Sequence, residues 1–354
     1  FTYKENIHTG AAAAARGTFT TVVMMANTKP PIDNKETLRY VLERGRDTGI
    51  HVLSCACVTM GLKGRELVPM EELADLGAAG FTDDGIPLLE EGLVRRAMER
   101  AAALDKPVSL HEEDPALIGD NGINRGKASE YFQLSGSPRE AEIRLVERDL
   151  RLALETGARV NIQHISARES VELVRQAKRQ GARVHGEATP HHFTLTQEAV
   201  IRYGTLAKMN PPLREEADRQ AIIEGLADGT IDIIATDHAP HAPWEKDRPV
   251  SQAPSGIIGL ETALPLAITG LVGKSGLTLE KILGLMSTNP ARLYGLDAGY
   301  LGEGGPADIV LLDPEGEVVP GGYASLSFNT PFTGWHLRGR VVKTIASGKV
   351  VYSR

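Results

Sequence analysis

The sequence predicts an α/β fold, a (β/α)8 barrel of the TIM type with a small β-sandwich unit. Three observations lead to this prediction. Segments with strand character alternate with segments of helical periodicity over most of the 354 residues, the connections between them are short, and short β runs gather near the carboxyl end. Repeated βα units with short connections imply a parallel sheet.

Each predicted strand is a short run of apolar or β-branched residues, as in Thr20 to Met25 (TTVVMM). The predicted strands are residues 20–25, 51–58, 78–82, 107–111, 159–164, 183–188 and 231–236. The segments between them place apolar residues on one helical face, as Leu38, Val41 and Leu42 do. Helices are therefore predicted at residues 34–48, 90–103, 138–156, 168–180 and 215–227.

This series of seven strands is one short of the number that closes a barrel of this type. Residues 206–209 could be counted as a further strand. They follow the strand 183–188 after only a short helix at 197–203, so we interpret them as an extra piece in a loop. The count alone does not decide between these interpretations.

The character of the chain changes after Asn289. A turn-rich break at residues 302–306 precedes short β runs at 308–312, 341–346 and 349–352, the last two joined by Ser347-Gly348. So few strands offer little core of their own and need a partner sheet. The sequence thus predicts a barrel over residues 1–300 and the C-terminal half of a small β-sandwich over residues 301–354.

Composition narrows the classes of partner and location. The net charge is −7 and no basic block occurs, which argues against nucleic acid as the main partner. No apolar run reaches the roughly 18 residues that a membrane helix needs. Cys55 and Cys57 are the only cysteines, so there is no disulfide framework, and we expect a cytoplasmic protein.

Polar side chains stand where the predicted strands end. Asp83-Asp84 follow the strand 78–82, His111 and His164 close the next two strands, and Asp237 follows the strand 231–236. The carboxyl ends of barrel strands form one rim, where enzymes with this fold place their active sites. Imidazole and carboxylate groups suit zinc, and also manganese or cobalt, and such a metal generates hydroxide near neutral pH. The sequence therefore predicts a metal centre at this rim.

At these motifs the sequence resembles the dihydroorotases of the amidohydrolase superfamily, over nearly the whole chain. The matching stretches are Met25 to Pro30 (MANTKP), Phe81 to Gly85 (FTDDG), His111 to Glu113 (HEE), Asn161 to Ser166 (NIQHIS), Lys208 to Arg214 (KMNPPLR), Thr236 to His241 (TDHAPH) and Ser255 to Thr262 (SGIIGLET). Each is modest by itself, but their order and spacing are specific to this family.

The resemblance implies a role for each matched residue. His111 and His164 would bind one metal ion, and Asp83 would bridge two metals, with Asp84 as the alternative if the alignment is shifted by one. Asp237 would bind the other metal and act as general acid and base. The substrate would be held by Asn27, Asn210, His241 and the loop from Pro254 to Gly256.

The resemblance also implies a zinc-dependent cyclic amidohydrolase with two zinc ions per chain. Its reaction would be the reversible hydrolysis of dihydroorotate to N-carbamoyl-L-aspartate in de novo pyrimidine biosynthesis. A homodimer is expected, and aspartate transcarbamoylase is a candidate partner. The alternatives are a hydantoinase or allantoinase, and a non-catalytic homologue that acts as a structural partner of aspartate transcarbamoylase.

The sequence departs from the family at its start. Family members carry an H-x-H metal motif on the first barrel strand, followed by a substrate-binding arginine, and no H-x-H occurs here. The first barrel strand is therefore expected to be missing, together with half of the small β unit. One or no zinc would bind if that segment is absent from the molecule. Three explanations are open: the molecule contains residues beyond those given, the chain is truncated, or the protein is a naturally short, non-catalytic homologue.

Overall fold

The computed structural model describes residues 1–120 and 122–354. Its strands are β1 (Thr21–Met24), β2 (His51–Ser54), β3 (Val108–Leu110), β4 (Val160–Ile162), β5 (Val184–Ala188), β6 (Ile233–Ile234), β7 (Ile309–Val318), β8 (Leu337–Ala346) and β9 (Lys349–Ser353). Its helices are α1 (Ile7–Arg16), α2 (Lys35–Arg46), α3 (Met70–Leu76), α4 (Glu91–Ala103), α5 (Lys127–Phe132), α6 (Glu140–Thr156), α7 (Arg168–Arg179), α8 (Pro190–Thr194), α9 (Glu198–Tyr203), α10 (Glu216–Asp228), α11 (Pro243–Lys246), α12 (Ala263–Leu271), α13 (Leu279–Met286) and α14 (Thr288–Tyr294), with 3-10 turns η1 (Met60–Leu62) and η2 (Gly204–Ala207).

The first six strands are parallel and form the wall of the barrel. β1 pairs with β2, and β3, β4, β5 and β6 pair in that order. Phe81 links the two groups, because it forms parallel bridges with both Ala56 and Val108. The predicted strand 78–82 is thus reduced to a bridge at Phe81. Residues 206–209 form no strand and begin within the turn η2, which agrees with their interpretation as part of a loop.

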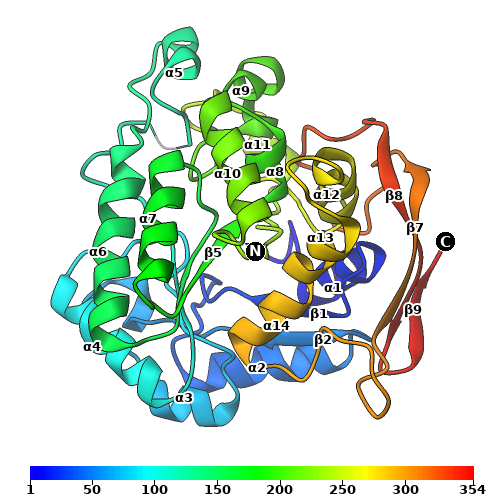
Figure 1. The fold of residues 1–354 in the computed structure, drawn as a ribbon, viewed down its shortest axis with the longest axis horizontal. Helices are drawn as coiled ribbons and strands as arrows, with labels where there is room; N and C mark the ends of the chain where they lie inside the picture. The colour runs from blue at the N-terminus through cyan, green and yellow to red at the C-terminus, as the bar shows by residue number, and fades with distance from the viewer. Residues whose placement is uncertain (121) are drawn as a thin grey trace.

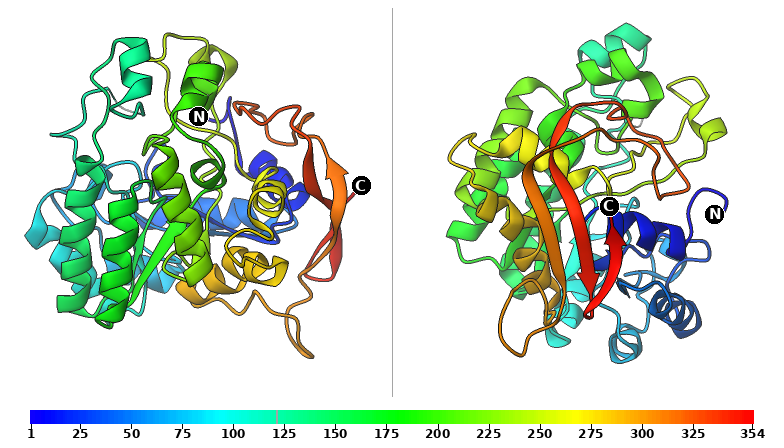
Figure 2. Two further views of the ribbon diagram at one scale, coloured as in Figure 1. Left: turned by 45° about the horizontal axis from the view of Figure 1, so that its top comes forward. Right: turned by 90° about the vertical axis from the view of Figure 1, so that its right-hand side faces the viewer.

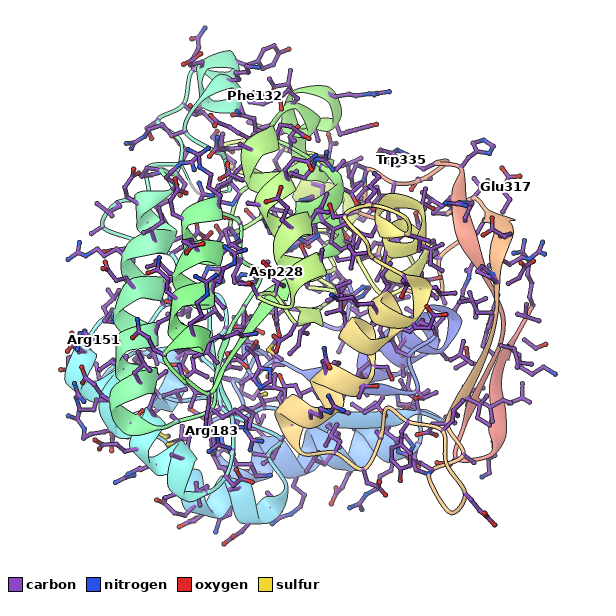
Figure 3. The ribbon with its side chains drawn as sticks, in the orientation of Figure 1. Phe132, Arg151, Arg183, Asp228, Glu317 and Trp335 are labelled. Atoms are coloured by element: carbon purple, nitrogen blue, oxygen red, sulfur yellow. The ribbon has the colours of Figure 1, made fainter. Side chains whose placement is uncertain are left out.

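Helices cover the outside of this wall. α4, α6, α7 and α10 stand next to one another, while α2 packs against β2 (Figure 1). Arg183, which directly precedes β5, marks the side on which the strands begin, and their carboxyl ends point the opposite way (Figure 3). The core between the two layers is apolar and includes Phe81, Ile162 and Ile234. None of the helices among the described residues is long and apolar enough to cross a bilayer.

A three-stranded antiparallel sheet of β7, β8 and β9 lies at the edge of the molecule, where it packs on α1 and α12 (Figures 1 and 2). Ser347 and Gly348 both have positive φ angles, of 48° and 73°, as the tight turn between β8 and β9 requires. Buried alanines of α1 and Ala346 of β8 share one apolar cluster. The division into residues 1–300 and 301–354 stays a prediction.

Candidate metal centre and substrate site

Three side chains that can bind a metal ion meet at the carboxyl ends of the barrel strands. They are Asp84, His111 and His164, and one potential ligand atom from each lies within 4.8 Å of the other two. His111 directly follows β3, and His164 lies two residues beyond β4. Because neighbouring parallel strands end at the same rim, segments that are far apart in the sequence deliver their side chains to one place.

The two histidines are in direct contact. His111 Nδ1 lies 3.0 Å from His164 Nε2, and the rings meet edge to face with centroids 4.7 Å apart. His164 Nε2 is also 3.9 Å from Asp84 Oδ1. His164 has a positive φ of 33°, which is strained for a residue with a side chain and is found mainly at functional sites. The fold thus holds two ring nitrogens and a carboxylate around one point.

Burial disfavours the charged form of each side chain in this cluster. It is the main cause that lowers the pKa of His164 well below its ordinary value, with the adjacent His111 as the second cause. Burial also lowers the pKa of His111, but nearby carboxylates, Glu113 first, outweigh it and raise the pKa overall. Burial raises the pKa of Asp84. A cation here would favour the carboxylate and the neutral imidazoles, and such donors fit zinc, manganese or cobalt.

Asp83, the carboxylate expected to bridge two metals, does not join the cluster. Its Oδ1 accepts the backbone N–H groups of Val58 at 2.7 Å and Thr59 at 3.1 Å, and its Oδ2 accepts the Thr59 hydroxyl. The structure therefore brings Asp84, the alternative, to the histidines. Asp83 instead anchors the backbone that follows β2. The backbone turns at Asp84, where the Ile86 N–H donates to the Asp83 carbonyl at 2.9 Å, and the two adjacent carboxylates make separate contacts.

Asp237 lies at the same rim, beyond β6. It lines a cavity of about 1960 Å³ that Asp84 and His164 also line. Burial, with Asp84 as the second cause, raises the pKa of Asp237 to about 7. Its φ of 43° is a second strained conformation at this rim. Asp237 is outside the group within 4.8 Å that includes Asp84, so its role as a metal ligand stays a prediction.

His191 was not predicted as a site residue. Its Nε2 lies 3.8 Å from Asp237 Oδ2, and burial lowers its pKa well below the ordinary value. Among the described residues this Nε2 has no hydrogen-bond partner. The only signal in the sequence is its position shortly after the strand 183–188, which the neighbouring His192 shares.

The residues expected to hold substrate are arranged around this centre. Asn27 Nδ2 donates to Asp84 Oδ2 at 2.9 Å, and Asn210 Nδ2 lies 3.4 Å from His111 Nε2. His241 Nε2 lies 2.8 Å from the carbonyl oxygen of Ser255, between the predicted Pro254 and Gly256.

These residues do not all reach the open space. Asn27, His241 and Ser255 line the cavity. In the part of the chain that the structure describes, Asn210, Pro254 and Gly256 are outside that lining. The substrate contacts predicted for Asn27, Asn210, His241, Pro254 and Gly256 all stay predictions.

A buried ion pair supports the loop that carries His164. Glu142 accepts the backbone N–H groups of Ser166 at 3.2 Å and Ala167 at 3.0 Å. Arg214 Nε donates to the Ser166 hydroxyl at 2.7 Å, and its Nη2 lies 3.7 Å from Glu142. Arg214 ends the motif KMNPPLR, so part of that motif supports the backbone beside a candidate metal ligand.

His192 makes the stability of the fold depend on pH. Its Nε2–H donates to the carbonyl of Pro211 at 3.0 Å, and its Nδ1 faces the Thr189 hydroxyl at 2.8 Å. Burial lowers its pKa to about 4. Because an unfolded histidine titrates near 6.5, the unfolded chain gains a proton first as the pH falls. The contribution of the neutral His192 ring to the free energy of unfolding is complete above about pH 6.5 and is lost as the pH falls through about 4.

We expect the free energy of unfolding of the wild type to fall more steeply than that of His192→Gln over this pH window, by roughly 3 kcal/mol in total. Glutamine keeps a donor for Pro211 but does not titrate. Urea unfolding at several pH values measures both curves, and the other buried histidines cancel in the comparison. Parallel curves would contradict the assignment.

Comparisons with known proteins agree with this geometry. A family model described as dihydro-orotase-like matches residues 2–170. A dihydroorotase of Clostridioides difficile is 54% identical over 353 residues, which is 100% of this chain and 84% of the relative. A dihydroorotase of Clostridium acetobutylicum is 50% identical, over 99% of this chain and 84% of the relative.

Solved structures show the same fold. An L-hydantoinase (dihydropyrimidinase) from Arthrobacter aurescens is similar with a TM-score of 0.87 and 27% identity, over 99% of this chain and 81% of that one. A D-hydantoinase (dihydropyrimidinase) from Thermus sp. has a TM-score of 0.84 at 22% identity, over 99% and 80%. The predicted α/β barrel class with an added β sheet is confirmed.

Proposed function

The chain belongs to the dihydroorotase family, and on that premise we propose that it catalyses the reversible hydrolysis of dihydroorotate to N-carbamoyl-L-aspartate, a step of de novo pyrimidine biosynthesis. One observation carries this proposal: Asp84 and the buried His111 and His164 form a ligand group at the rim of a cavity that Asp237, Asn27 and His241 line. The identity of about half of the residues with named dihydroorotases supports it.

Asp84, His111 and His164 would hold a zinc ion, and a second zinc would lie beside Asp237. When bound, the metal supplies a hydroxide nucleophile and polarises the substrate carbonyl. The protein supplies a neutral imidazole at His164, because burial opposes protonation of that ring. Asn27 donates through its amide to the Asp84 carboxylate, so the orientation of that carboxylate is fixed before a metal ion binds.

Asp237 would move the proton. The reaction breaks the ring C–N bond, and the leaving nitrogen must gain a proton while the attacking water loses one. A single carboxyl can take that proton and return it, most effectively when its pKa is near the working pH. The pKa of Asp237, raised to about 7, is consistent with this role. His191, 3.8 Å away, would help to orient the carboxyl group.

His241 and Asn27 would bind the substrate. Burial and the ammonium of Lys4, 3.1 Å from His241 Nδ1, lower the pKa of His241 to about 4, so the ring is neutral at pH 7. With Nε2–H directed at Ser255, Nδ1 accepts from the Lys4 ammonium, and both residues line the cavity. A cation and neutral polar groups suit a ring that carries a carboxylate. The homodimer, association with aspartate transcarbamoylase and a cytoplasmic location stay predictions.

The decisive test compares substrates on one zinc-loaded preparation. We expect kcat/KM for dihydroorotate to exceed that for hydantoin or allantoin by at least about 100-fold, because a site built around polar groups rejects rings that leave them unpaired. Ultraviolet absorbance follows the loss of each ring. Faster turnover of hydantoin would favour the hydantoinase alternative, which the structural similarity to an L-hydantoinase also suggests. Stoichiometric zinc without turnover of any ring would favour the non-catalytic homologue.

A further inference from the structure

Two buried lysines hold the loop next to His241. Lys208 Nζ donates to the carbonyls of Val250 and Ala253, both at 2.7 Å. Lys246 Nζ donates to the carbonyls of Pro254 at 2.8 Å and Gly256 at 3.0 Å. Lysine is almost never fully buried in proteins, yet these two are only 4% and 5% exposed. Burial lowers the pKa of both side chains, so each position is costly for an ammonium group.

Asn329 joins the same loop to the backbone of His241. It lies in the connection between β7 and β8, residues 319–336, which leaves the sheet beyond Glu317 and returns beside Trp335 (Figure 3). Its Oδ1 accepts the backbone N–H of His241 at 2.9 Å. Its Nδ2 donates to the carbonyls of Ala239 at 2.9 Å and Gly256 at 3.0 Å. The side chain is buried, and both of its polar atoms are used.

Gly256 is the point where these contacts converge. Its carbonyl oxygen accepts from both Lys246 and Asn329, which uses both lone pairs. Its φ of +145° favours glycine, and a Cβ there would come within 2.8 Å of the His241 ring. The ring of His241 therefore rests against bare backbone, while its Nε2–H binds Ser255. Any shift of the loop would move this ring.

We propose that Asn329 and Lys246 are positioning residues, which fix the Gly256 carbonyl and thereby the His241 ring on the substrate side of the cavity. This rests on the proposed function, in which His241 binds substrate. An apolar side chain could fill either position at lower desolvation cost. The polar groups instead fasten two segments, 239–241 and 250–256, to each other and to a connection of the C-terminal sheet. Neither residue touches the ligand group or Asp237, so their effect is on substrate binding.

The test separates KM from kcat. We expect Asn329→Ala and Lys246→Met to raise KM for dihydroorotate roughly tenfold or more, the scale of one lost buried hydrogen bond. kcat and bound zinc should stay within about twofold of the wild type, since the ligands and Asp237 are untouched. Lys246→Gln, which keeps two N–H donors without the charge, should restore much of the KM. Asn289→Ala is the matched control, because its amide donates to the Asp232 carbonyl at the opposite, amino end of β6.

A second readout needs no turnover. The ring N–H that His241 donates to Ser255 should give a slowly exchanging proton signal in nuclear magnetic resonance spectra, assigned by its loss in His241→Gln. We expect this signal to shift or broaden in Asn329→Ala and to be unchanged in Asn289→Ala. If the wild type fails to hydrolyse dihydroorotate, the proposed function fails while this signal still tests the positioning. An unchanged signal together with an unchanged KM in either folded variant would overturn the inference. If Asn329→Ala does not fold, Lys246→Gln and Lys246→Met decide.

Discussion

Asp237→Asn is expected to lower kcat for dihydroorotate hydrolysis by about 10³-fold or more, because a positioned acid and base typically contributes 10²–10⁴-fold. Asparagine keeps the size of the side chain but can neither accept nor return a proton at neutral pH. The loss should appear in kcat more than in KM, since the proposed role of Asp237 is to carry the proton between the attacking water and the leaving nitrogen. Steady-state kinetics on zinc-loaded protein measures both constants.

Asp232→Asn is the matched control for this variant. Asp232 precedes the same strand, β6, and its carboxylate pairs with Lys178 at 3.2 Å and His185 at 3.0 Å, away from the rim. We expect its activity to stay within about twofold of the wild type, since these half-buried pairs lie at the amino end of β6 and do not touch the ligand group or Asp237. If Asp237→Asn retained wild-type kcat with the fold intact, Asp237 could not be the proton carrier.

Asp84→Asn is expected to remove most of the bound zinc and with it the turnover. The reason is that an amide replaces the only carboxylate in the ligand group formed by Asp84, His111 and His164, and zinc favours charged oxygen and neutral nitrogen donors. Elemental analysis of zinc per chain after dialysis measures the loss directly, and the kinetic assay follows its consequence. The overall fold should change little, since Asp84 is partly exposed and bonded mainly to Asn27.

Asp83→Asn is the paired variant, and we expect it to lower the stability of the fold but not the zinc content. Its carboxylate accepts two backbone N–H groups and the Thr59 hydroxyl. In the asparagine variant the amide NH2 group would face one of these donors, and a hydrogen bond would be lost. We expect a loss of roughly 2 kcal/mol in the free energy of unfolding, with zinc still bound. Zinc loss in Asp83→Asn but not in Asp84→Asn would reverse our assignment of the ligand.

Much of the site could be predicted from the order of elements in the chain. Apolar runs that alternate with amphipathic helices predict parallel strands, and parallel strands place their carboxyl ends at one rim. That argument predicts that His111 and His164 lie together, and the structure places their ring nitrogens 3.0 Å apart. The length of the strand predicted at 78–82 was overestimated, because a buried segment can join a sheet through the bridges of one residue, here those of Phe81 to Ala56 and Val108.

The sequence by itself determined the family, the barrel class and the strand ends that carry the polar groups, since these depend on local periodicity and motif order. Only the tertiary structure decided which of two adjacent carboxylates faces the histidines. The backbone turns at Asp84, so the direction of each carboxylate depends on contacts with distant segments, which are Val58 and Thr59 for Asp83 and Asn27 for Asp84. The tertiary structure also decided that Asn329, from the far end of the chain, joins the backbone of His241 to that of Gly256. No local pattern records such a contact, because it exists only once the sheet connection has packed against the rim.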